Sequence, residues 1–180
     1  MDQSEQVRKL IEYIGKEKYQ ELENQVPEKY KKEITINFSE FLLKQTEQQI
    51  LDFYGGLINN NNQWTTTKQC GSVIILASHV HDLLKKLVQT RETDQEVIKN
   101  LTKNFDLHYL ILYCVAKYNV PKEYFIQMME LKHFRNMVGH NFNGVLETSF
   151  REAIEPICRG HLLVIVLTQM LRGSQNVKQT

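Results

Sequence analysis

Apolar residues recur every three to four positions along most of the chain, which is the spacing of amphipathic helices. In residues 3–30 the pattern is interrupted at Gly15 and Pro27, and it predicts short helices between these breaks. Residues 34–36 are strand-like, but three residues do not form a sheet. Ser39 has a side chain suited to capping the helix that follows it. The first third of the chain is therefore predicted to be helical.

The pattern strengthens in the second half, where it predicts four longer helices. They span residues 72–88, 94–118 (capped by Thr93 or Asp94), 121–138 and 146–171. Pro121 suits the first turn of the third helix, and Gly139 is expected to end that helix. Pro156 and Gly160 are expected to bend the fourth. Because residues 162–167 are apolar on every side of a helix, we expect them to be buried at the centre of a bundle.

A run of asparagines from Asn59 to Asn62 is the clearest loop in the chain. We place a boundary there, with residues 1–62 as an N-terminal helical extension and residues 63–180 as a helical bundle. Residues 173–180 are expected to form a polar tail. The predicted fold class is all-α.

The composition is that of an ordinary globular protein, with 42% apolar and 24% charged residues in a chain of 180. The longest apolar run, residues 109–116, is far shorter than the roughly 18 residues that span a bilayer. Cys70, Cys114 and Cys158 include no C-x-x-C pair, which favours reduced thiols and a cytoplasmic location. The acidic, polar N-terminus does not resemble a secretory signal.

Charge is distributed unevenly, although the net charge is only +1. Residues 1–60 carry eight Lys or Arg and eleven Asp or Glu, whereas residues 61–180 carry fourteen and ten. A mildly basic region can bind a polyanion such as RNA, but it is more often a solvated surface. The charge alone therefore names no partner.

The most informative stretch for chemistry runs from residue 131 to residue 140. On a helical wheel, Arg135 lies in the middle of an apolar face formed by Phe125, Met128, Leu131 and Val138. Burying a guanidinium among apolar groups costs several kcal/mol unless it is paired. Arg135 therefore has either a structural partner, for which Glu123 and Glu152 are candidates, or a functional use.

Asn136 and His140 complete a candidate site around Arg135. On a continuous helix His140 lies about 140° around the axis from Arg135, whereas a break at Gly139 would let the imidazole turn back toward it. A guanidinium binds a phosphodiester through paired hydrogen bonds, and a histidine transfers protons near neutral pH. Asn136 lies at the edge of the apolar face, where it can orient a side chain or a phosphate. An Arg and a His that converge on one spot suit phosphodiester chemistry.

The sequence from Arg135 to His140, with asparagine directly after the arginine, resembles the R-x4-6-H motif of the HEPN superfamily. The resemblance covers roughly residues 65–175 in helix order. It implies an all-α, HEPN-like four-helix bundle. Active members of this family resemble metal-independent endoribonucleases that work as dimers, with the Arg and His of both chains lining one cleft. The implied partners are an RNA substrate, a second copy of the chain and an antitoxin or activator protein, in a toxin–antitoxin or antiviral defence setting. No cofactor, metal or membrane is implied.

In the mechanism that this resemblance implies, His140 deprotonates the ribose 2′-hydroxyl or protonates the leaving 5′-oxygen. Arg135 stabilises the charge of the transition state, and Asn136 positions the phosphate or the histidine. Lys132, His133 and Arg151 are weaker candidates for RNA contact. HEPN toxins paired with nucleotidyltransferase antitoxins often carry a tyrosine two residues after the histidine. Here that position is Phe142, which has no hydroxyl to modify.

Two other interpretations remain open at this point. The first is a non-catalytic HEPN-like module that binds RNA, a nucleotide or a protein, and the second is a helical adaptor in which the motif is accidental. A metal site at His79 and His81 is not expected, because these residues lie 200° apart on a helix and metal-binding pairs use a spacing of four. Trp64 is expected to anchor the end of the bundle rather than to stack on a base.

Overall fold

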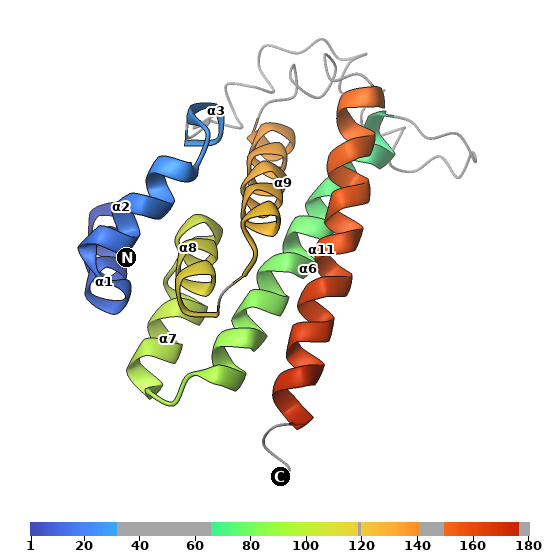
Figure 1. Cartoon of the computed structure of the whole chain (residues 1–180). Coiled ribbons are helices and arrows are strands. Elements are labelled where there is room, and N and C mark those ends of the chain that lie inside the picture. Colours follow the sequence, from blue (N-terminus) through green and yellow to red (C-terminus); the bar gives the residue numbers. More distant parts are fainter. Residues whose placement is uncertain (32–65, 119, 141–149, 177–180) are drawn as a thin grey trace.

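The computed structural model describes residues 1–31, 66–118, 120–140 and 150–176. Every regular element in these ranges is a helix, which confirms the all-α prediction (Figure 1). The elements are α1 (Gln3–Ile14), α2 (Lys16–Gln25), α3 (Glu28–Lys31), α6 (Thr66–Arg91), α7 (Gln95–Lys103), α8 (Leu107–Tyr118), α9 (Lys122–His140) and α11 (Phe150–Asn176). The predictions for residues 34–36, Ser39, Asn59–Asn62 and Trp64, and with them the predicted domain boundary, lie outside the described residues.

The N-terminal helices break where the sequence predicts. The Asp2 carboxylate caps α1 by accepting a hydrogen bond from the Glu5 backbone N–H at 2.8 Å. Gly15 separates α1 from α2 with a φ of +84°, a conformation that glycine adopts far more easily than other residues. Pro27 lies between α2 and α3. The two predicted breaks are therefore confirmed.

The predicted long helix over residues 94–118 is wrong, because the chain forms two helices there. Asp94 does cap α7, and its side chain accepts hydrogen bonds from the backbone N–H groups of Glu96 and Val97. The break at residues 104–106 is stabilised by Gln6 of α1, whose side chain pairs with Asp106 in both directions. The Asp106 backbone N–H donates to the Gln6 Oε1 at 2.7 Å, and the Gln6 Nε2 donates to the Asp106 Oδ2 at 3.0 Å. A partner 100 residues away in sequence thus supports the break.

The last two helices extend further than predicted. Helix α9 begins directly after Pro121, as expected, but it continues through Gly139 to His140. Helix α11 contains Pro156 and runs to Asn176, so residues 173–176 belong to the helix and not to a polar tail. The expected start of this helix at residue 146 lies outside the described residues.

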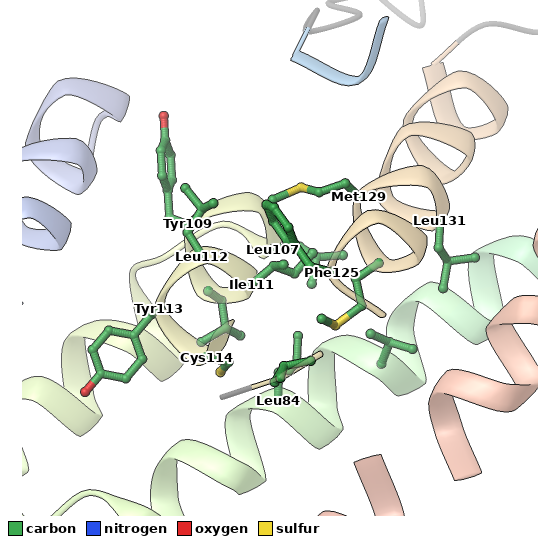
Figure 2. Packing of buried hydrophobic residues seen from close by; sticks show 14 of the residues in the cluster. Leu84, Leu107, Tyr109, Ile111, Leu112, Tyr113, Cys114, Phe125, Met129 and Leu131 are labelled. Atoms are coloured by element: carbon green, nitrogen blue, oxygen red, sulfur yellow. The ribbon is translucent and has the colours of Figure 1, made fainter. Parts of the chain in front are cut away.

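One hydrophobic core joins the N-terminal helices to the rest of the described chain. Helix α8 is its centre, since seven of its residues are buried and it contacts α1, α2, α6 and α9. Figure 2 shows Leu107 and Ile111 of α8 close to Phe125 and Met129 of α9, with Leu84 of α6 beside them. Helices α1 and α2 lie on the side of α8 away from α11 (Figure 1).

The expectation that residues 162–167 are buried on all sides is wrong. Leu163 and Leu167 are buried, but Leu162 is 54% exposed and Ile165 is 53% exposed. The reason is that α11 packs one face against α6 and α9, and the described residues cover no more than that face. None of the helices in the described ranges is long and apolar enough to cross a membrane.

Candidate functional site

Helix α9 carries the candidate motif in its last two turns, and the turns that precede the motif pack into the hydrophobic core. Phe125, Met128 and Leu131 are fully or almost fully buried against α6, α8 and α11, as the helical wheel predicts. Arg135 lies one turn beyond Leu131 and is partly buried. The arginine therefore stands where the apolar face of α9 meets the surface.

The guanidinium of Arg135 is held by the side chain of the next residue. Its Nε and Nη2 groups both donate to the Oδ1 atom of Asn136, at 3.1 and 2.9 Å. A guanidinium has five N–H groups, so three of them take no part in this contact. Asn136 thus fixes one edge of the planar cation and leaves the remaining donors to another acceptor.

No carboxylate among the described side chains lies within ion-pair distance of Arg135. Burial lowers the pKa of Arg135, and the nearby negative charge of Asp106 opposes this shift. Glu123, one of the two structural partners considered above, lies exposed in the first turn of α9 and about three turns away from Arg135. The side chain of Glu152, the other candidate, lies outside the described residues.

His140 is the last residue of α9, and the helix is continuous from Arg135 to it. The break at Gly139 that would turn the histidine back toward Arg135 is therefore absent. Helical geometry places the two Cα atoms about 140° apart around the axis and roughly 7.5 Å apart along it. The side chains of His140 and Arg151 lie outside the described residues.

Lys132 lies inside the protein rather than on a surface that faces RNA. It is 7% exposed, and its Nζ donates to the backbone oxygen of Tyr30 at 3.4 Å. The same Nζ lies 3.4 Å from the Nδ1 of His108, whose Nε2 lies 2.6 Å from the Glu23 Oε1. This chain of polar groups joins α2 and α3 to α8 and α9. We therefore do not retain Lys132 as an RNA contact.

His133 is partly buried, and its ring lies 5.2 Å from the ring of Tyr30, measured between centroids. Burial, followed by the positive charges of Lys132 and Lys29, lowers the pKa of His133. The imidazole is therefore neutral at neutral pH. It can offer a hydrogen bond or a ring face to a ligand, but it adds no positive charge.

His81 of α6 lies near Arg135, and the sequence did not predict it as part of this site. Its Nε2 is buried and has no hydrogen-bond partner among the described residues. Burial, together with the positive charges of Lys85 and Arg135, lowers the pKa of His81 to about 4, and the negative charges of Asp82 and Asp106 oppose this shift. The sequence does contain one indication that His81 faces the interior. It lies four residues after Ala77 and three before Leu84, both of which are buried, so it shares their face of α6.

Taken together, the described part of the site is a partly buried cation held by an amide, with a neutral histidine within electrostatic range. Such a site suits the binding of an anion through charged hydrogen bonds, and a phosphate is the anion that a planar guanidinium fits best. The described residues include no group of three or more His, Cys, Asp or Glu side chains that could hold a metal ion. Comparison with known proteins finds no matching family model, no matching curated protein and no matching solved structure.

Proposed function

We propose that this protein is a metal-independent endoribonuclease of the HEPN type, built on a HEPN-like four-helix bundle with an N-terminal helical extension. Its substrate is RNA, which it cleaves at a site formed by Arg135, Asn136 and His140 of two copies of the chain. The proposed setting is a cytoplasmic toxin–antitoxin or antiviral defence system, with an antitoxin or activator protein as a further partner.

The observation that carries this proposal is the environment of Arg135. A partly buried guanidinium costs free energy unless a negative charge compensates it. The described residues provide an amide oxygen from Asn136, and Asp106 acts on Arg135 only from beyond ion-pair distance. A phosphate of the RNA backbone would supply the missing charge, and it would accept the N–H groups that Asn136 does not use.

The geometry of α9 favours a site shared between two chains. Because the helix does not break at Gly139, Arg135 and His140 of one chain diverge around its axis. In the proposed dimer, the histidine of one chain therefore works with the arginine of the other. A two-fold arrangement also supplies two imidazoles, and this reaction needs both a base and an acid.

The proposed reaction is a transesterification. One His140 accepts the proton of the ribose 2′-hydroxyl as the 2′-oxygen forms a bond to phosphorus. The second His140, in its protonated form, gives its proton to the 5′-oxygen as the bond between that oxygen and phosphorus breaks. Arg135 stabilises the negative charge on the phosphorane oxygens, and Asn136 holds Arg135 in place. The products are a 2′,3′-cyclic phosphate and a 5′-hydroxyl.

The experiment that tests this function is cleavage of a mixed-sequence RNA in the presence of EDTA by the wild-type protein and by His140→Ala. We expect the wild type to leave 2′,3′-cyclic ends and the variant to lose cleavage. Cleavage that continues in a pure His140→Ala preparation would assign the chemistry to other residues. A folded wild-type protein that cleaves no RNA, with or without an activator, would contradict the proposed activity.

A non-catalytic binding module is the second candidate, and one observation favours it. The two described histidines near the motif, His81 and His133, both have a lowered pKa. Neither is therefore a protonated acid at neutral pH, and proton transfer depends on His140 alone. RNA binding that requires Arg135 but leaves the RNA intact would support this second candidate.

A further inference from the structure

A stripe of exposed residues runs along the outer face of α11. We call it the outer stripe, and it consists of Glu155, Cys158, Leu162, Ile165, Gln169 and Arg172, all of which are exposed. Alternating steps of three and four residues keep these side chains on one face of the helix, as the contact positions of a coiled coil do. The opposite face, with Ile157, Leu163 and Leu167, is buried against α6 and α9.

The middle of the outer stripe is apolar, and the neighbouring helix α6 also exposes apolar residues. Leu162 and Ile165 are each more than half exposed, as is Ile75 of α6 at 56%, and the neighbouring Ile74 is 40% exposed. Helix α6 runs beside α11 in the same direction (Figure 1). A Cβ atom at Gly160 would lie 3.1 Å from Leu76, which places Ile75 near the level of this patch. Grouped exposed apolar residues mark an interaction surface.

The outer stripe is symmetric about its midpoint, which lies between residues 163 and 164. Leu162 and Ile165 are equidistant from the midpoint, as are Cys158 and Gln169, and Glu155 and Arg172. When the stripe is laid antiparallel on a second copy of itself, apolar residues meet at the centre. At each end Glu155 then faces Arg172 of the partner subunit. A parallel pairing would instead place identical charges opposite each other, which is unfavourable.

We propose that the outer stripe is an interface at which two copies of this chain associate, with α11 antiparallel to α11 of the partner subunit. The partner is a second copy because the stripe is complementary to itself: its apolar residues meet at the centre, and opposite charges meet at its two ends. Ile74 and Ile75 of α6 widen the apolar contact on either side. This inference does not depend on the proposed function.

The antiparallel register has a consequence for the motif on α9. Gly160 is level with Leu131, because a Cβ atom at position 160 would lie 3.5 Å from that leucine, and Arg135 lies one turn further from the midpoint. Pairing through α11 therefore displaces the two Arg135 residues in opposite directions along the paired helices, each by roughly 11 Å from the midpoint. A cleft shared by Arg135 and His140 of two chains needs a separate contact at α9, so the two interfaces can be lost independently.

The first test is the mass of the full-length protein in solution, measured by sedimentation over a range of concentrations. We expect the double variant Leu162→Glu/Ile165→Glu to lose one association step that the wild type shows, with unchanged helical circular dichroism. The matched control Gln20→Glu/Thr93→Glu adds the same charge at exposed positions of α2 and the α6–α7 loop, and it should associate as the wild type does. A monomeric wild type, or a double variant that associates normally, would overturn the interface.

Charge reversal tests the register. Glu155→Arg and Arg172→Glu should each weaken association, and the double variant should restore it with the charges exchanged. The pair that Glu155 forms with Arg159 within the helix is lost equally in Glu155→Arg and in the double variant. Association of the double variant that is weaker than that of both single variants would contradict the antiparallel register.

Disulfide cross-linking tests the same register independently. Cys158 is exposed and free, so it can form a bond with a cysteine introduced in the partner subunit. In a Cys70→Ser background, Gln169→Cys should form dimers through bonds between residue 158 of one chain and residue 169 of the other. Removing Cys158 as well should abolish these dimers. Cross-links from 158 to 158 or from 169 to 169, identified by peptide mapping, would show a parallel pairing and overturn the proposal.

Discussion

The side-chain oxygen of Asn136 accepts two hydrogen bonds from the guanidinium of its neighbour Arg135, at 3.1 and 2.9 Å. Two adjacent residues on a helix point in different directions, so this contact bends both side chains toward the same spot. The amide is neutral, and it orients the cation without cancelling its charge. This combination keeps Arg135 fixed in place and still able to attract an anion.

The substitution Asn136→Asp tests the importance of that neutrality. It would place a carboxylate against the guanidinium, and the resulting ion pair would compete with a phosphate for Arg135. We expect RNA binding or cleavage to fall about tenfold or more, equivalent to roughly 1.4 kcal/mol, with the helical content unchanged. Gln20→Glu, an exposed change of the same charge on α2, is the control. Equal losses in the two variants would show that only the net charge matters.

Arg135→Ala distinguishes a functional arginine from a structural one. Breaking a buried ion pair costs about 3–5 kcal/mol, because the other charge is left without a partner. Arg135 has no such partner among the described residues, so we expect the free energy of unfolding to change by less than about 1 kcal/mol. Urea denaturation measures this directly. A loss of several kcal/mol would mean that Arg135 has a structural partner, for which Glu152 remains the candidate.

His81 predicts a specific dependence of stability on pH. Its pKa is about 4 in the folded protein and 6.5 in the unfolded chain, so the unfolded state binds more protons between these values. The contribution of His81 to stability is therefore complete above pH 6.5 and is lost as the pH falls from 6.5 toward 4. His81→Gln should flatten the stability profile in this window. His79→Gln, an exposed change on the same helix, should leave that slope unchanged. Identical slopes in all three proteins would contradict the buried, neutral state of His81.

Gly160 and Gly71 provide a matched pair for the packing of α11 on α6. A Cβ atom at Gly160 would lie 3.1 Å from the Leu76 Cδ1 and 3.3 Å from its Cβ, whereas one at Gly71 would meet nothing within 4 Å. We expect Gly160→Val to lower the free energy of unfolding by about 1–3 kcal/mol. Gly71→Ala should raise it by about 0.5–1 kcal/mol, because alanine favours the helix. Thermal denaturation of the two variants checks both signs.

Local signals in the sequence predicted most of the helices. Gly15, Pro27, Asp94 and Pro121 act through their own backbone or through neighbours a few residues away, and each marks a helix boundary as predicted. The break between α7 and α8 was missed, and the side chain that supports it, Gln6, lies 100 residues away in sequence. No local pattern contains that contact.

The errors in burial have a similar cause. Residues 162–167 are apolar on all sides, and periodicity cannot tell a helix at the centre of a bundle from one that exposes an apolar face. Leu162 and Ile165 belong to the second kind. For Lys132 the error is the reverse: it was expected at the surface as an RNA contact, but it is buried. Its burial follows from the packing of Tyr30 and His108 around it.

The candidate site was predicted only in part. The helical wheel placed Arg135 on the apolar face of α9, but its contact with Asn136 was not predicted, because adjacent residues on a helix point in different directions. His81 comes from a different helix, and only the packing of α6 against α9 brings it within electrostatic range of Arg135. The expected helix break at Gly139 is absent, because glycine lowers helix stability by only about 1 kcal/mol and the rest of α9 outweighs it.

The most direct measurement for the central claim is the rate of RNA cleavage in EDTA by the wild type, Arg135→Ala and Arg8→Ala. Arg8 is an exposed arginine on α1 that pairs with Glu5, so its removal changes the net charge equally without touching the site. We predict that Arg135→Ala lowers the rate by about 100- to 1000-fold, while Arg8→Ala cleaves like the wild type. Equal rates for Arg135→Ala and the wild type would contradict the assignment of Arg135 to the chemistry.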